Sequence, residues 1–309
     1  MKNTFALFTL LLTALVVNSQ TMYSKAFGNP ENPVLLFLHG GPGYNSVGFE
    51  ASTAQVLSDN GFYVITYDRR GEGRSAELPA DFTFDQTFND LHALYAKYHL
   101  KSATLIGHSF GGIVATLFAE KYPEKTKSVI LVGAPLSMQA TLTTILVSSK
   151  SIYETNNDSV NLHYIQLLEQ MDKSTLPYSS YCFSHAMQNG FYYPSHPSSE
   201  ALIIYSKFRS NPELAKASSL MSYEAPTGFW TNENYTTLDL TDHLINVLAA
   251  TTPVFGLYGQ EDGLFSVSQV LNIEQLLGKE NISYFTNCSH NVFMDQQTQF
   301  IQAIKTWVQ

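Results

Sequence analysis

The chain has 309 residues, of which 44% are hydrophobic and 13% aromatic, enough to bury one large α/β core with an inserted lid. Its formal net charge is -9 at pH 7 and its sequence has no basic stripe, which argues against nucleic acids and anionic membrane surfaces as partners. The two cysteines, Cys182 and Cys288, allow one disulfide without requiring it, and their spacing does not suggest a zinc site.

The N-terminal segment has the features of a cleavable signal peptide. Lys2 supplies a positive charge, and the apolar stretch 5–17 that follows is too short to span a bilayer comfortably. Modest side chains at 17–19 offer a cleavage site before Gln20. We therefore expect residues 1–19 to be removed, the mature protein to be secreted or periplasmic, and no stable membrane anchor to remain.

Apolar runs alternate with helical patterns along most of the remaining chain. Strands are expected at 34–38, 62–67, 103–106, 129–132, 253–258 and 282–286, with a short edge strand at 22–27. Helices are expected at about 47–57, 84–98, 267–277 and 296–307. This alternation predicts an α/β fold with a doubly wound, mostly parallel sheet, whose functional residues lie at the carboxyl ends of the strands.

The character of the sequence changes between 136 and 248. This stretch is mostly helical in pattern, contains aromatic clusters such as 191–193 and 229–230, and shows no obvious buried parallel strand. We expect it to form a helical cap inserted over a core domain made of 20–135 and 249–309. Most of its aromatic side chains are expected to form the core of the cap itself.

The strand expected at 103–106 leads directly into Gly107-His108-Ser109-Phe110-Gly111, which matches the pattern G-x-S-x-G. With a strand before it and a helix after it, this pattern is typical of a nucleophile elbow, a tight turn that exposes a serine hydroxyl. The two glycines let neighbouring backbone pass close to the turn. The alternative is a glycine-rich turn that carries a solvated serine.

A serine hydroxyl becomes a nucleophile only beside a base, and the base needs a carboxylate to orient it. In proteins with this elbow the chain order is serine, acid, histidine. Asp262 and His290 each follow an expected strand, so both should return to the edge of the sheet that carries Ser109. The alternatives left open are Glu261 and Asp242 as the acid, and His39 and His108 as the base.

The negative charge that develops in such a reaction needs two backbone donors. One is the N–H of Phe110, directly after the serine, and the other should come from the loop after the strand at 34–38. That loop reads His39-Gly40-Gly41-Pro42-Gly43. We expect Gly41 to be the second donor, because backbone without a side chain can approach a substrate closely.

Three motifs stand at strand ends: the loop 39–43, the segment Asp68-Arg69-Arg70-Gly71-Glu72-Gly73-Arg74-Ser75, and the elbow 107–112. Together they resemble the α/β-hydrolase fold superfamily and are most similar to its proline iminopeptidase branch, which the H-G-G-P-G loop marks. The resemblance covers about 20–135 and 250–309. It implies a Ser-Asp-His hydrolase that removes N-terminal residues, often proline, from peptides.

The same branch uses cap glutamates to hold the free amine of the substrate, which makes Glu200, Glu224 and Glu233 candidates here. The elbow departs from that branch, since Phe110 and Gly111-Gly112 look more like general esterases and lactonases. Two alternatives therefore remain beside an aminopeptidase for short peptides: a hydrolase of small esters or lactones, and a non-catalytic protein that binds a ligand in the same pocket. No metal or organic cofactor is implied, and the oligomeric state is not indicated.

Overall fold

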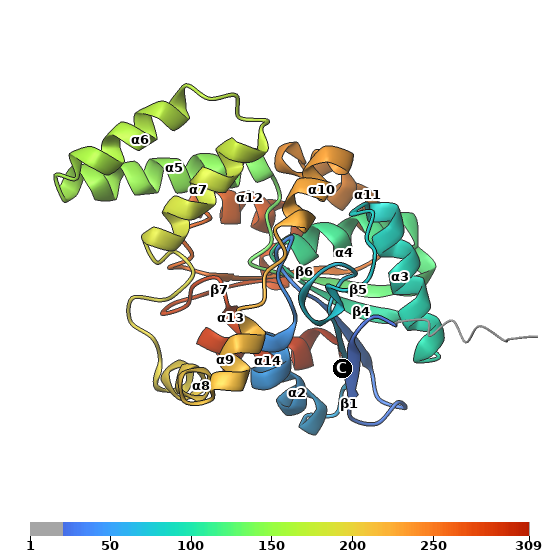
Figure 1. Cartoon of the computed structure of the whole chain (residues 1–309). Coiled ribbons are helices and arrows are strands. Elements are labelled where there is room, and N and C mark those ends of the chain that lie inside the picture. The colour runs from blue at the N-terminus through green and yellow to red at the C-terminus, as the bar shows by residue number, and fades with distance from the viewer. Residues whose placement is uncertain (1–20, 309) are drawn as a thin grey trace, which may run out of the picture.

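A computed structural model describes residues 21–308, so the predicted signal peptide lies outside the described residues. Its centre is a seven-stranded sheet in the order β1-β3-β2-β4-β5-β6-β7 (Figure 1). Strand β1 pairs with β3 in the antiparallel sense, and every other neighbouring pair is parallel. The predicted α/β fold with a doubly wound, mostly parallel sheet is confirmed.

The strands follow the apolar runs of the sequence closely. They are β1 Ser24–Phe27, β2 Val34–Leu38, β3 Tyr63–Tyr67, β4 Ala103–His108, β5 Thr126–Val132, β6 Val254–Gly259 and β7 Ile282–Phe285. Strand β5 begins three residues earlier than expected, although Thr126 and Ser128 are polar. The buried hydroxyl of Ser128 lies 2.9 Å from that of Thr104 on β4, so the two satisfy each other inside the sheet.

Helices cover both faces of the sheet and bury its two apolar sides. One face carries α3 Phe84–Lys97, α4 Phe110–Lys121, α11 Thr241–Ala249 and α12 Val267–Leu277. The other carries α1 Val47–Phe49, α2 Gln55–Asp59, α13 Val292–Asp295 and α14 Gln297–Val308. The single helix expected at about 47–57 is instead two short helices joined by the π-helical turn Glu50–Ala54.

The cap leaves the core after β5 and returns before α11. Its helices are α5 Met138–Thr155, α6 Ser159–Glu169, α7 Leu176–Gln188, α8 Ser199–Ser210, α9 Pro212–Ser218 and α10 Glu224–Glu233. The outgoing and returning segments are hydrogen-bonded to each other, because Met138 N donates to Leu238 O and Leu240 N donates to Leu136 O. The two segments that connect the cap to the core are thus joined by backbone hydrogen bonds.

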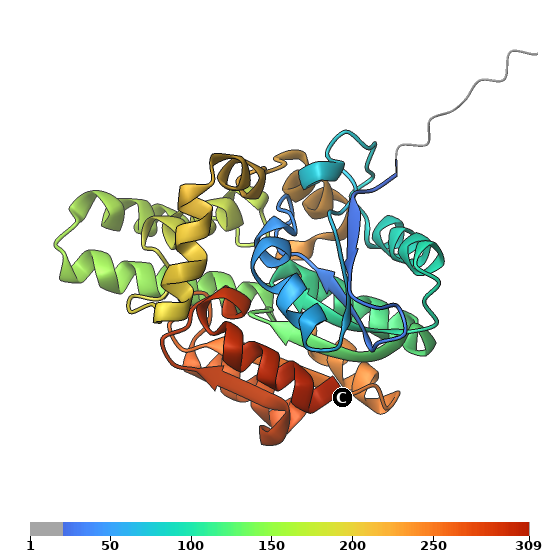
Figure 2. The ribbon, with the colours of Figure 1, turned by 90° about the horizontal axis from the view of Figure 1, so that it is seen from below.

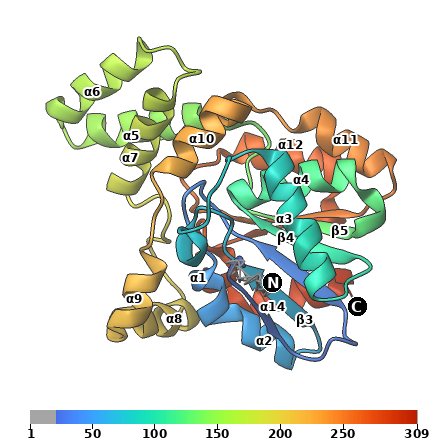
Figure 3. The same cartoon turned by 45° about the vertical axis from the view of Figure 1, so that its right-hand side comes forward.

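The cap helices divide into two groups. The α5–α6 hairpin projects beyond the core with α7 beside it (Figures 1 and 2). By contrast, α8 packs against α13 (Figure 1) and α9 packs against α1 (Figure 3). Helix α11, most of which falls within the predicted cap range, packs against α4 of the core. Among residues 21–308 no helix is long and apolar enough to cross a membrane. Cys182 and Cys288 are both buried and unpaired with each other.

Candidate active site

Ser109 occupies the turn between β4 and α4 in a backbone conformation that side chains rarely adopt, with φ 51° and ψ -122°. Close packing of the turn enforces this conformation. A Cβ added at Gly107 would lie 2.6 Å from the carbonyl oxygen of Gly111, and one added at Gly111 would collide with the carbonyl of Leu38. The backbone N–H of Ser109 donates to Val132 O at 2.9 Å, which ties the turn to β5. Strain of this kind is common where a side chain must be presented to a ligand.

Asp262 and His290 meet at the same edge of the sheet, after β6 and β7. The Nδ1 atom of His290 lies 2.8 Å from Oδ2 of Asp262, and both side chains are buried. The other carboxylate oxygen of Asp262 accepts the backbone N–H of Leu264 at 3.0 Å. With Nδ1 held by a carboxylate, the opposite nitrogen of the ring, Nε2, is the one left to accept a proton.

The alternative acid Glu261 lies one residue away but points to the cap, where its carboxylate accepts the backbone N–H and the hydroxyl of Ser195. The alternative acid Asp242 lies exposed in the first turn of α11. The alternative base His39 accepts the backbone N–H of Arg69 at 3.0 Å.

His108, the remaining alternative base, packs its ring 4.8 Å from that of His290. Burial, reinforced by the neighbouring His290, holds the pKa of His108 well below its usual value and keeps it neutral.

Ser109 and His290 open into one cavity of about 520 Å³ between the sheet edge and the cap. Gly41 and Phe110, the two expected backbone donors, line the same cavity. The rest of its wall is largely apolar. Most of it comes from the cap, with side chains that include Met138, Phe183, Met187, Tyr192 and Met221, and the segment after β6 adds Leu264 and Phe265. A cavity of this size and character suits a small organic ligand.

No Asp, Glu, Lys or Arg among residues 21–308 lines this cavity. Glu200 accepts the N–H and the hydroxyl of Thr298, and Glu233 accepts the N–H of Phe84. Glu224 lies exposed at the start of α10. The structure thus places all three predicted amine-binding glutamates outside the cavity wall. Glu200 and Glu233 instead accept backbone N–H groups at the starts of α14 and α3.

Residues 33–297 match the alpha/beta hydrolase fold family. The chain belongs to this family. Among curated relatives it is 25% identical to a proline iminopeptidase of Lacticaseibacillus rhamnosus (strain Lc 705), over 93% of this chain and 94% of the relative. It is also 25% identical to the sn-1-specific diacylglycerol lipase ABHD11 of Danio rerio, over 93% and 82%. A crystal structure of a proline iminopeptidase-related protein from Thermus thermophilus shares the fold with a TM-score of 0.66 at 23% identity, covering 93% and 94% of the two chains.

In this α/β hydrolase fold protein, Arg69 fixes the loop that carries Gly41. Its guanidinium donates to the carbonyl oxygens of His39 and Gly40 and is paired with Glu72, with Nε 2.9 Å from Oε1. Glu72 also accepts the backbone N–H of Gly43 at 2.7 Å. In a trans peptide the C=O and N–H point in opposite directions, so a hydrogen bond to the Gly40 carbonyl turns the Gly41 N–H away from Arg69.

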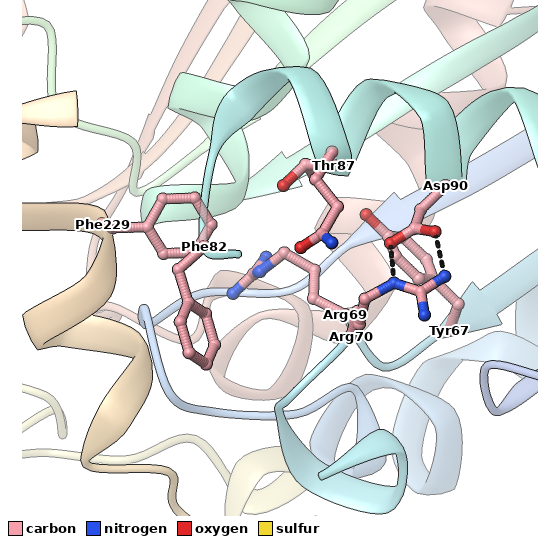
Figure 4. A pocket seen from close by; sticks show the side chains of 8 residues that line it. Tyr67, Arg69, Arg70, Phe82, Thr87, Asp90 and Phe229 are labelled. Atoms are coloured by element: carbon pink, nitrogen blue, oxygen red, sulfur yellow. Dashed lines mark hydrogen bonds and ion pairs between the residues drawn. The ribbon is translucent and has the colours of Figure 1, made fainter. Parts of the chain in front are cut away.

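The neighbouring arginine, Arg70, pairs with Asp90 and not with the loop that carries Gly41. Figure 4 shows the guanidinium of Arg69 extending toward Phe82 and Phe229, whereas that of Arg70 extends the other way to form two bonds with Asp90. Both arginines line a small cavity of about 10 Å³ together with Tyr67, whose hydroxyl is buried. Arg69 also lies 5.2 Å from the centre of the Phe110 ring. It therefore contacts both segments expected to supply backbone donors, while Arg70 contacts neither in this way.

Another buried carboxylate, Asp295, contacts the loop that carries His290. Asp295 is fully buried and accepts the Tyr205 hydroxyl of α8 at 2.5 Å and the backbone N–H of Ser289 at 2.8 Å. Burial raises its pKa to about 6, although these two hydrogen bonds favour the ionised form. Asp295 thus joins the cap to the loop that carries His290.

No role was predicted from the sequence for Arg69, Glu72, Asp295 or Tyr192, and the ring of Tyr192 lies 5.2 Å from that of His290. The first two stand in a motif dense in charged residues directly after a buried strand, a signal that could have suggested a buried ion pair. Asp295 and Tyr192 carry no such signal, because their positions depend on contacts with distant segments.

The raised pKa of Asp295 predicts a pH-dependent stability difference. A folded-state pKa above the ordinary 3.8 means that its stabilising effect is complete below about pH 3.8 and is lost as the pH rises through about 6. The free energy of unfolding of the wild type, minus that of Asp295→Asn, should therefore fall by roughly 3 kcal/mol between pH 3.8 and 7. Urea unfolding of both proteins across this range measures it; a constant difference would contradict the assignment.

Proposed function

We propose that this chain is a serine hydrolase that cleaves esters whose acyl group is small and carries no charge. The observation that carries the proposal is the cavity beside Ser109, which no charged side chain among residues 21–308 lines and most of whose wall is apolar. Burial of a neutral acyl group in this cavity is favourable, because apolar surface is removed from water. A charged group would lose its hydration without finding a partner, which costs several kcal/mol.

In the proposed reaction, His290 takes the hydroxyl proton of Ser109 as the serine oxygen attacks the ester carbonyl. The ring becomes a cation, which Asp262 stabilises through the 2.8 Å contact to Nδ1. The same proton then passes to the departing alcohol, leaving an acyl group on the serine. Water attacks this acyl-enzyme with His290 again as the base, releasing the acid and restoring the free serine.

The oxyanion that forms in both steps would be stabilised by the backbone N–H groups of Phe110 and Gly41. The first N–H also belongs to the N-terminus of α4, whose dipole favours negative charge. The second is oriented through the Arg69 bond to the Gly40 carbonyl. This part of the proposal makes Arg69 a positioning residue that acts without touching the substrate.

An aminopeptidase of the proline iminopeptidase type is the second candidate. It is supported by the loop His39-Gly40-Gly41-Pro42-Gly43 and by relatives of that name that are 22–25% identical over almost the whole chain. Such an enzyme has to bind a protonated amine, which needs a nearby carboxylate. Because the described cavity wall supplies none, we rank this candidate second.

A pair of substrates with the same ring separates the two candidates. The 4-nitrophenyl esters of cyclopentanecarboxylic acid and of proline differ mainly in a neutral CH₂ against a protonated NH₂ group. We expect kcat/KM to be at least about 10-fold higher for the cyclopentane ester, because the amine would be buried without a partner. Faster hydrolysis of the prolyl ester would favour the aminopeptidase, and no hydrolysis of either ester would contradict both.

If Asp262 is the acid that orients His290, substitutions at Asp262 and at its neighbour Glu261 should have different effects on kcat. Asp262→Asn should lower kcat by roughly 10³–10⁴-fold, since an amide favours the wrong histidine tautomer and does not stabilise its cation. Glu261→Gln removes only a contact to Ser195 and should stay within a few-fold of the wild type. Steady-state kinetics on the cyclopentane ester measure both, and a larger loss in Glu261→Gln would reverse the assignment.

The proposed role of Arg69 predicts a second contrast. Arg69→Lys keeps a positive charge near Glu72 but lacks the planar guanidinium that donates to the carbonyl oxygens of His39 and Gly40. We therefore expect kcat to fall about 10- to 100-fold with little change in KM. Arg70→Lys is the matched control and should remain near the wild type. Equal losses in both variants, or a change confined to KM, would show that Arg69 does not orient an oxyanion donor.

A further inference from the structure

The mouth of the cavity is edged by apolar side chains that face solvent. Tyr44, Met187, Tyr193 and Met221 all line the cavity, yet 36%, 60%, 60% and 54% of their surfaces are exposed. Side chains that are both lining and exposed mark the opening. Large exposed apolar side chains gathered at one place on a protein surface indicate contact with another apolar surface.

The segment Leu220–Tyr223 extends this edge and is fastened in place. Ser222 N donates to Gly43 O at 2.8 Å, and Asn45 Nδ2 donates to Leu220 O at 2.9 Å. These bonds tie the segment to the loop that carries Gly41. Leu220 and Tyr223 do not line the cavity but are 38% and 83% exposed. The apolar side chains are therefore held outward beside the opening, where burial would otherwise favour turning them inward.

We infer that this mouth, defined as Tyr44, Met187, Tyr193 and Leu220–Tyr223, docks on an uncharged lipid–water interface from which the cavity takes its ester. The inference rests on the proposed ester hydrolase function. Tyr44, Met187, Tyr193 and Met221 belong both to the cavity wall and to the exposed surface, so an ester chain can pass along apolar side chains from the interface into the cavity. Methionine adapts its shape to an irregular partner, and tyrosine suits an interface that is apolar on one side and wet on the other.

The net charge of the chain favours a neutral lipid interface over an anionic one. The chain carries a formal net charge of -9, and no residue of the mouth is basic. A surface of anionic lipids attracts basic clusters and would repel this protein. An interface of neutral esters imposes no such penalty, so binding would depend on apolar contact alone and would vary little with salt.

The test follows hydrolysis of tributyrin, a neutral ester, as its concentration passes the solubility limit. The wild type should hydrolyse the dissolved ester and its rate should rise several-fold once droplets form. Leu220→Ser/Tyr223→Ser, which leaves the cavity wall unchanged, should keep the rate on dissolved ester and lose most of the rise. Val160→Ser/Tyr164→Ser removes two side chains of α6 that are 64% and 53% exposed, and should behave like the wild type.

The outcomes separate the inference from the function on which it rests. No hydrolysis of dissolved ester would contradict the proposed function. Hydrolysis without a rise at the solubility limit, or a rise that Leu220→Ser/Tyr223→Ser retains, would overturn the docking inference alone. A wild type that is dimeric in solution while this variant is monomeric would assign the mouth to a second copy of the chain and would also overturn it.

Discussion

The candidate site depends on one close contact, between the start of α4 and the end of β2. Gly111 lies against the backbone carbonyl of Leu38, where any side chain would collide. This contact lets β4 turn sharply into α4, which places Ser109 in its strained conformation. It also brings the loop after β2 beside the serine, so a single packing constraint positions the proposed nucleophile and one proposed oxyanion donor together.

Two buried pairs hold the remaining parts of the site. Arg69 is paired with Glu72 beneath the loop that carries Gly41, and Asp262 with His290 at the far end of the site. Leaving such a charge alone would be costly, so each pair fixes the geometry of its segment even where its net contribution to stability is small. The cavity between these pairs is by contrast uncharged among the described residues. That contrast is the physical basis for proposing a neutral substrate.

The sequence predicts the sheet and the residues at its edge because both depend on local patterns. Each predicted strand is present among residues 21–308, and Ser109, Asp262 and His290 follow β4, β6 and β7 as expected. The cap was harder, since its contacts join segments far apart in the chain. The family resemblance made Glu200 and Glu233 candidate amine ligands, but in the structure their carboxylates accept hydrogen bonds from Thr298 and Phe84. A helical pattern does not reveal which of its polar residues face a cavity.

The proposed function requires Ser109 to be the nucleophile of an ester hydrolase. An alkyl fluorophosphonate, which forms a stable bond with an activated serine, tests it most directly when the labelled protein is digested and examined by mass spectrometry. We expect one adduct per chain, on the peptide that contains Ser109, together with loss of ester hydrolysis, and no adduct in Ser109→Ala. An adduct on another residue, or full hydrolysis by Ser109→Ala, would contradict it.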